Sequence, residues 1–249
     1  MNSFMSWIGG KKILRKKILE QFPELYSRYV EVFGGAGWIL FAEERKIEFE
    51  VYNDVNSDLV NLYRCVKYHP EALQAELKNI LMSREQFIDA KVQIETRGLT
   101  DIQRAAKFFI LVKESYGTDL RSFGVRPKNM NNAIEYLDEI SRRLSTVVIE
   151  NLDFEHILNT YDKADTLFYL DPPYYKTEKY YPDRFLPEDH IRLKKKLSVL
   201  KGKFLLSYND CAYIREMYKE YNIIEVERSH NLIIQGKKPR YMELIIRNY

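Results

Sequence analysis

The residues best suited to chemistry are four consecutive ones that follow a short apolar run. Residues 166–170 read Thr-Leu-Phe-Tyr-Leu, which is typical of a buried strand, and directly after them come Asp171, Pro172, Pro173 and Tyr174. The two prolines end the strand because neither donates a hydrogen bond to a ladder. We therefore expect a stiff acidic loop (residues 171–174) at the carboxyl end of a strand, where open α/β sheets bind their ligands.

The acidic loop combines a carboxylate, carbonyls released from the ladder and an aromatic ring. These groups suit a planar molecule that carries an exocyclic NH2 group. The Asp171 carboxylate and one of these carbonyls can accept its two N–H hydrogens, and the Tyr174 ring can stack on its face. The alternative is a Pro-Pro turn with an N-capping aspartate, so the interpretation depends on the rest of the chain.

A glycine loop (residues 34–37) lies between a strand predicted at 29–33 and a helix predicted from residue 38. After Phe33 it contains three glycines: Gly34, Gly35 and Gly37. A strand, a glycine loop and a helix open many nucleotide-binding units, where glycine lets a ligand approach the backbone. The spacing is not GxGxxG, and a shorter loop suits a cofactor without a pyrophosphate, such as S-adenosylmethionine.

A second acidic residue, Asp54, follows the next predicted strand at 48–52. An acidic residue at this point binds ribose hydroxyls in such folds. The alternative is that Asp54 is the N-cap of the following helix, although Asn56 or Ser57 can serve that cap instead. We favour the ribose role.

The N-terminal region contains Trp7, a Gly-Gly turn and Lys11. We expect a helix to begin near Lys11 or Lys12, with free N–H groups at its start and the flat Trp7 ring beside them. The alternative is a core tryptophan and a solvated lysine, which is the favoured interpretation if these residues are taken alone.

Composition narrows the class of protein. The chain has 249 residues, of which 45% are apolar and 30% charged, and it shows neither an apolar run of 18 residues nor a signal-peptide pattern. We expect a protein of the cytoplasm with no membrane partner. Cys65 and Cys211 are isolated and only four histidines occur, so we expect no disulfide and no metal site. The net charge is only +3, but four basic clusters, near residues 11–17, 121–128, 194–203 and 237–240, are compatible with phosphate contacts.

The strand pattern stops between residues 69 and 145, and helices are predicted at 70–81, 84–96, 101–114 and 132–144. Between the last two lies a loop (residues 115–129) with two glycines, aromatic residues and three cations. A helical insert with such a loop can reach into a groove of nucleic acid. The alternative is an ordinary surface loop, and the residues alone leave the two interpretations even. The candidate contacts are Tyr116, Arg121, Arg126 and Lys128.

The α/β pattern resumes after the insert. Strands are predicted at 146–150, 166–170, 203–208, 222–227 and 240–247, with helices at 187–200 and 211–219. The last two strands are joined by residues 229–238 without a helix, which predicts an antiparallel hairpin at one end of a mostly parallel sheet.

Four motifs in this order resemble the Dam-type (D12 class) adenine-specific DNA methyltransferases in the alpha arrangement: residues 7–11, 33–37, 53–56 and 171–174. The closing segment 243–249 resembles the last strand of that family. The resemblance covers about residues 4–68 and 146–249. It implies a Rossmann-like class I S-adenosylmethionine-dependent methyltransferase sheet with an antiparallel C-terminal hairpin. It also implies a catalytic domain of residues 1–68 and 146–249 and a small helical target-recognition domain of residues 69–145.

The resemblance also implies roles for residues. The catalytic positions are Asp171, Pro172, Pro173 and Tyr174. S-adenosylmethionine is expected at Trp7, Lys11, Phe33, Gly34, Gly35, Gly37, Asp54 and Asp171. The expected substrate is double-stranded DNA, with no metal, and a cognate restriction enzyme is a candidate partner. The Phe-Asn-Val-Pro-Tyr-Gly stretch of GATC-methylating members is absent, and residues 115–124 occupy its place.

The expected reaction transfers a methyl group to the N6 amine of an adenine that is flipped out of the duplex. Cytosine N4, an RNA or a protein amide are alternative acceptors on the same fold. A DNA-binding protein without catalysis is a different class, and the complete acidic loop argues against it. A dinucleotide-dependent oxidoreductase is a third alternative, and the missing GxGxxG argues against that.

Overall fold

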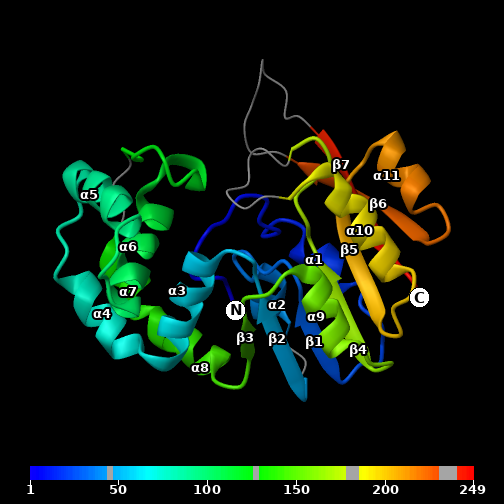
Figure 1. Cartoon of the computed structure of the whole chain (residues 1–249), viewed down its shortest axis with the longest axis horizontal. Coiled ribbons are helices and arrows are strands. Elements are labelled where there is room, and N and C mark those ends of the chain that lie inside the picture. Colours follow the sequence, from blue (N-terminus) through cyan, green and yellow to red (C-terminus); the bar gives the residue numbers. More distant parts are fainter. Residues whose placement is uncertain (44–46, 126–128, 178–184, 230–239) are drawn as a thin grey trace.

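The computed structural model describes residues 1–43, 47–125, 129–177, 185–229 and 240–249. Within these residues, a single seven-stranded sheet has the order β3-β2-β1-β4-β5-β7-β6 (Figure 1). Its strands are β1 (Arg28–Glu31), β2 (Phe49–Asn53), β3 (Val148–Glu150), β4 (Thr166–Leu170), β5 (Lys203–Asn209), β6 (Asn222–Ser229) and β7 (Arg240–Arg247). The first five are parallel, and β7 pairs antiparallel with both β5 and β6. The α/β fold class and the antiparallel C-terminal strands are confirmed.

The helices of the described residues fall before, within and after the insert. They are α1 (Arg15–Leu19), α2 (Trp38–Ala42), α3 (Ser57–Tyr68), α4 (Pro70–Lys78), α5 (Arg84–Ile94), α6 (Asp101–Glu114), the 3-10 turn η1 (Tyr116–Thr118), α7 (Met130–Glu135), α8 (Leu137–Leu144), α9 (Phe154–Tyr161), α10 (Pro187–Leu197) and α11 (Ala212–Met217). Local signals place several starts: Ser83 caps α5, and Thr100 with Gln103 forms a capping box at α6.

The sheet is buried on both faces because successive side chains of a strand point to opposite sides. In β1, Tyr29 packs in the core on the side of α1, α2 and α3, whereas its neighbour Val30 packs in the core on the side of α9, α10 and α11. Figure 1 shows α9 and α10 lying over one face of the strands. All five residues of β4 are buried, which explains their continuous apolar character.

The site elements meet at one edge of the sheet. Strand β1 pairs in parallel with β2 on one side and with β4 on the other, so it lies where the strand order reverses. The glycine loop follows β1, Asp54 follows β2 and the acidic loop follows β4. Because the carboxyl ends of parallel strands lie at the same edge, these three segments become neighbours at the point where such sheets bind ligands.

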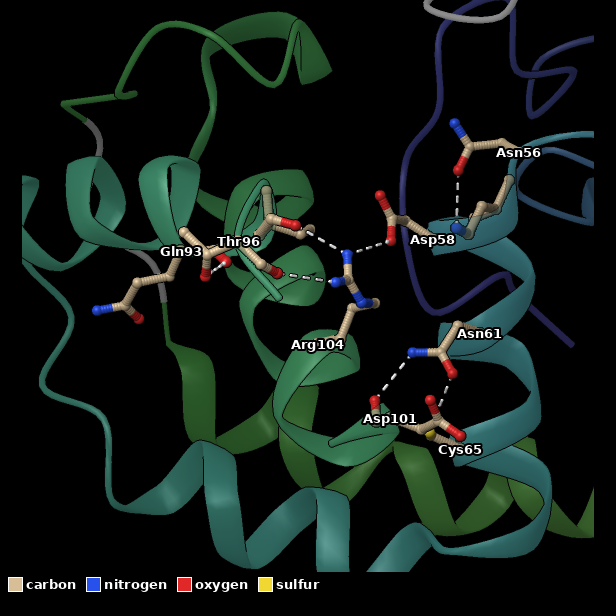
Figure 2. Close-up of polar contacts among 10 residues, drawn as sticks. Asn56, Asp58, Asn61, Cys65, Gln93, Thr96, Asp101 and Arg104 are labelled. Carbon is tan, nitrogen blue, oxygen red and sulfur yellow. Dashed lines mark hydrogen bonds and ion pairs between the residues drawn. The ribbon is translucent and has the colours of Figure 1, made fainter. Parts of the chain in front are cut away.

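The insert lies beside the sheet and is tied to it through α3 (Figure 1). Figure 2 shows the guanidinium of Arg104, on α6, between two elements. It donates hydrogen bonds to Asp58 on α3 at 3.2 Å, to the carbonyl of Ile94 at the end of α5 at 2.8 Å, and to that of Thr96 just after it at 3.3 Å. These contacts fix α5 and α6 on a helix that also packs against the sheet.

Two predicted helices differ from the observed ones. The helix expected near Lys11 begins only at Arg15, because the Lys11 carbonyl accepts hydrogen bonds from Leu14 and Arg15 in a turn. The helix expected over 132–144 is divided at Tyr136, whose hydroxyl donates to the carbonyl of Asn2. The predicted hairpin connection at 229–238 falls almost entirely on residues outside the described ones.

Candidate active site

A cavity opens at the carboxyl edge of the sheet, between the glycine loop and the acidic loop. Among its lining residues are the predicted cofactor positions Trp7, Lys11, Phe33, Gly34, Gly35, Asp54 and Asp171. Pro173 of the acidic loop and Asn53 of β2 also line it. Tertiary folding therefore brings together residues from four separate segments, and Gly37 is the one predicted cofactor position that does not reach the cavity wall.

The glycine loop is packed against the protein's own aromatic side chains. A Cβ atom on Gly34 would lie 2.3 Å from the Tyr52 ring, and one on Gly37 would lie 2.9 Å from the Tyr63 hydroxyl. Gly35 and Gly37 also have positive φ, 49° and 64°. The sequence argument attributed these glycines to the approach of a ligand; in the structure, internal packing and backbone conformation already require them.

Asp54 braces the glycine loop. Its Oδ2 accepts a hydrogen bond from the Gly35 N–H at 2.8 Å, and its Oδ1 accepts one from the Asn56 N–H at 2.9 Å. The N-cap of α3 is Asn56, whose side chain accepts from the Leu59 N–H. The alternative N-cap role of Asp54 is therefore wrong, and Asp54 is one of the residues that line the cavity.

Trp7 connects the cavity to the insert. A Cβ atom on Gly35 would lie 2.8 Å from Trp7 Cδ1, so the indole covers the glycine loop at close range. On its other side the Trp7 ring packs against Phe108 of α6, with ring centroids 5.9 Å apart. Trp7 and Phe108 also line a second cavity, between the N-terminal region and Thr118–Arg121. The insert therefore contributes to the cavity through Phe108, which packs against the cavity-lining Trp7.

Lys11 and Asp171 form a buried ion pair in the cavity. Lys11 Nζ lies 2.6 Å from Asp171 Oδ1, and the side chains are 3% and 16% exposed. The same ammonium donates to the Gly9 carbonyl at 3.1 Å and lies 4.8 Å from the centroid of the Tyr174 ring. The alternative of a solvated Lys11 is wrong, because its side chain is buried and pairs with Asp171 of the acidic loop. Lys11 is therefore not part of the exposed basic cluster predicted near residues 11–17.

Tyr174 is held through its hydroxyl, which donates a hydrogen bond to Glu243 Oε2 at 2.6 Å. Burial, with the charges of Asp171 and Glu243, raises the pKa of Tyr174 well above its usual value. The phenol therefore stays a neutral donor at physiological pH. Pro172 is buried and Pro173 is partly exposed, so the two prolines present the loop in one conformation.

Two residues at the candidate site, Glu31 and Glu243, were not predicted from the sequence. Glu31 lines the cavity, is 2% exposed, and accepts hydrogen bonds from the Tyr29 hydroxyl at 2.9 Å and the Leu40 N–H at 2.7 Å. Burial raises its pKa to about 8, and the charge of Asp171 adds to the rise. A glutamate inside a predicted buried strand was the available signal for both positions.

The insert displays the candidate DNA contacts that the structure describes. Tyr116 in η1 is 72% exposed, and Arg121 is exposed as well. The segment around them is ordered by hydrogen bonds, since Asp119 Oδ1 accepts from the N–H groups of Arg121 and Ser122. Arg126 and Lys128 lie outside the described residues.

The strand order, the glycine loop and the acidic loop together define a class I methyltransferase architecture. The family model of the D12 class N6 adenine-specific DNA methyltransferases matches residues 7–232. The chain belongs to this family, whose reaction is methylation of adenine N6 in DNA. This finding removes the oxidoreductase alternative and favours adenine over cytosine.

Three curated relatives match this chain over most of their own lengths. The type II methyltransferase M1.LlaDCHI of Lactococcus lactis subsp. cremoris is 28% identical, over 100% of this chain and 96% of its own. The type II methyltransferase M.MjaIII of Methanocaldococcus jannaschii is 30% identical, over 99% of this chain and 98% of its own. A DNA adenine methylase of Haemophilus influenzae is 24% identical, over 91% of this chain and 86% of its own.

The described residues were also compared with the requirements of a membrane span and of a metal site. In the part of the chain that the structure describes, helices are all too short or too polar to cross a membrane. The same residues contain no group of three or more His, Cys, Asp or Glu side chains placed to hold a metal ion.

Proposed function

We propose that this protein transfers the methyl group of S-adenosylmethionine to the N6 amine of an adenine at a specific sequence of duplex DNA. The observation that carries the proposal is the placement of the Lys11–Asp171 pair and the acidic loop against a cavity that the glycine loop and Asp54 also line. The proposed catalytic residues and the proposed cofactor residues therefore lie around the same cavity.

The residues around the cavity fit S-adenosylmethionine. Trp7 and Phe33 supply aromatic walls suited to an adenine ring, and the Asp54 carboxylate suits ribose hydroxyls. Asp171 is a carboxylate suited to the cationic groups of the cofactor, and Glu31 places a carboxyl group beside it that can form a hydrogen bond. When bound, the cofactor supplies an electrophilic methyl group on its sulfonium. Lys11, the glycine loop (with Gly37 behind it) and these side chains hold and orient it.

The acidic loop orients the accepting amine. A target adenine flipped out of the duplex stacks on the Tyr174 ring, and its amine donates hydrogen bonds to the Asp171 carboxylate and the Pro172 carbonyl. These acceptors stabilise the positive charge that develops on nitrogen as it is alkylated. Pro173 keeps the loop stiff, so the alignment is preorganised. Neither a metal nor a covalent enzyme intermediate is required by this chemistry.

The insert is the proposed target-recognition domain, residues 69–145, with residues 1–68 and 146–249 as the catalytic domain. Tyr116 and Arg121 project from its exposed segment, and Arg126 and Lys128 follow in the sequence. We propose that these side chains contact DNA. Since DNA is the substrate, the proposed compartment is the cytoplasm, and a restriction enzyme with the same target is the proposed partner.

The test is methyl transfer from labelled S-adenosylmethionine to unmethylated bacterial DNA, with the digested nucleosides identified by mass spectrometry. N6-methyladenine in DNA, followed by sequencing of the methylated sites, is the expected outcome. N4-methylcytosine would overturn the choice of base. Cofactor binding without any label in DNA would overturn the substrate and direct the search to RNA or protein amides, or to a protein that binds without catalysis.

A further inference from the structure

The antiparallel strand β7 contributes a charged group to the active site. Because β7 runs opposite to β5, its first residues lie at the carboxyl edge of the sheet, with Glu243 paired in register with Asn209 at the end of β5. Glu243 is only 4% exposed, in a strand whose next residues Leu244, Ile245 and Ile246 are all core. A carboxylate buried to this extent needs partners, and its partners are site residues.

The partners of Glu243 are Tyr174 and Lys11. Its Oε2 accepts the Tyr174 hydroxyl at 2.6 Å and lies 3.8 Å from Lys11 Nζ. The ammonium is thus located between two carboxylates, nearer to Asp171 at 2.6 Å. A hydrogen bond donated to a charged acceptor fixes the direction of the tyrosine ring more firmly than one donated to a neutral acceptor.

We propose that Glu243 is a positioning residue for methyl transfer. It holds the Tyr174 ring at the angle that stacks on the flipped adenine, and it shares the Lys11 ammonium, so that Asp171 keeps its strength as an acceptor for the amine. This inference rests on the proposed function, because it assigns a partner to the proposed stacking residue. Glu243 itself touches neither the base nor the cofactor in this arrangement.

The test compares Glu243→Gln, which preserves shape and an acceptor oxygen, with Tyr174→Phe, which removes only the hydroxyl. Glu243→Gln should lower kcat about 10-fold, with the KM values for DNA and S-adenosylmethionine changed by less than about 3-fold, since misalignment acts on the transition state. In the Tyr174→Phe background the same substitution should change kcat by less than about 3-fold, because groups in contact are not additive. A full 10-fold loss in both backgrounds, or no loss in either, would overturn the proposal.

The matched control is Glu50→Gln. Glu50 is a buried carboxylate of β2 that pairs with Arg143 at 2.6 Å, away from the cavity. The Glu50→Gln variant should melt at a lower temperature than the wild type and have the same kcat. If Glu50→Gln lowers kcat as much as Glu243→Gln, the effect is a general one of buried charge and the assignment fails. If the wild-type enzyme does not methylate DNA at all, the proposed function fails first, which distinguishes the two.

Discussion

Charged and aromatic side chains gather in two regions of this protein, and the fold treats the two regions in opposite ways. At the carboxyl edge of the sheet, Lys11 and Glu243 are buried, and Asp171 and Tyr174 lie partly buried beside them. In the insert, Tyr116 and Arg121 project from an exposed segment. Both regions combine cations with an aromatic ring, but they differ in how far the side chains are exposed to solvent.

The difference in burial suits the two regions, the sheet edge and the insert, to different tasks. Charges in a dry, packed site interact strongly and hold one geometry, which suits the alignment of a reacting amine. Exposed charges on mobile stems are screened by salt and adapt to a partner, which suits contacts with phosphates. One enzyme therefore needs both regions, and the Trp7–Phe108 contact links them physically.

The strongest way to break the comparison is Asp171→Ala. We expect it to lower methyl transfer about 1000-fold or more, because the amine loses its charged acceptor, while melting still shows a folded protein. The measurement is the rate of label transfer to DNA. Asp138→Ala, on the exposed side of α8, is the control and should transfer at the wild-type rate. Wild-type turnover by Asp171→Ala would remove the acidic loop from the mechanism.

The Lys11–Asp171 pair allows buried and exposed ion pairs to be compared directly. Lys11→Met should lower the free energy of unfolding by about 3 kcal/mol, since it leaves a carboxylate in a buried site without its cation. Lys219→Met removes the cation of an exposed pair with Glu216 and should leave stability unchanged. Denaturant unfolding measures both. Equal effects of the two substitutions would show that the pair at the sheet edge is effectively solvated.

The raised pKa of Glu31 makes the stability of the buried region depend on pH. Its pKa rises from 4.5 to about 8 on folding, so between these values the folded protein holds a proton that the unfolded chain has released. Stability should therefore fall by up to about 1.4 kcal/mol per pH unit as pH rises from 4.5 towards 8, and level off above it. Glu31→Gln should remove that part of the slope in unfolding measured at several pH values. An identical slope in the variant would count against a neutral Glu31.

The smallest effect is expected in the insert. Arg121→Ala should weaken DNA binding a few-fold and reduce the slope of log affinity against log salt by about 0.9, the value for one phosphate contact in duplex DNA. Binding to unmethylated duplex at several salt concentrations is the measurement. An unchanged slope would exclude Arg121 from the DNA interface, and the exposed region would then lose its proposed role.

The sequence by itself determined the strands, most helices and the order of the motifs. Short-range signals were sufficient there: the apolar run at 166–170, the prolines after it and the capping box at Thr100 each act within a few residues. The acidic loop and the glycine loop were recognised in the same way. The start of α1 was predicted about four residues early, because a local turn at Lys11 precedes the helix.

Only the tertiary structure decided which charges became part of the site. Lys11 was expected to be solvated if taken alone, and its ion pair with Asp171 depends on two segments 160 residues apart in sequence. Glu31 and Glu243 lie within strands and were given no role from the sequence. The pairing of β7 with β5 places Glu243 beside Tyr174. The physical reason is that burial and partner choice depend on strand order and direction, and neither is a local property of the chain.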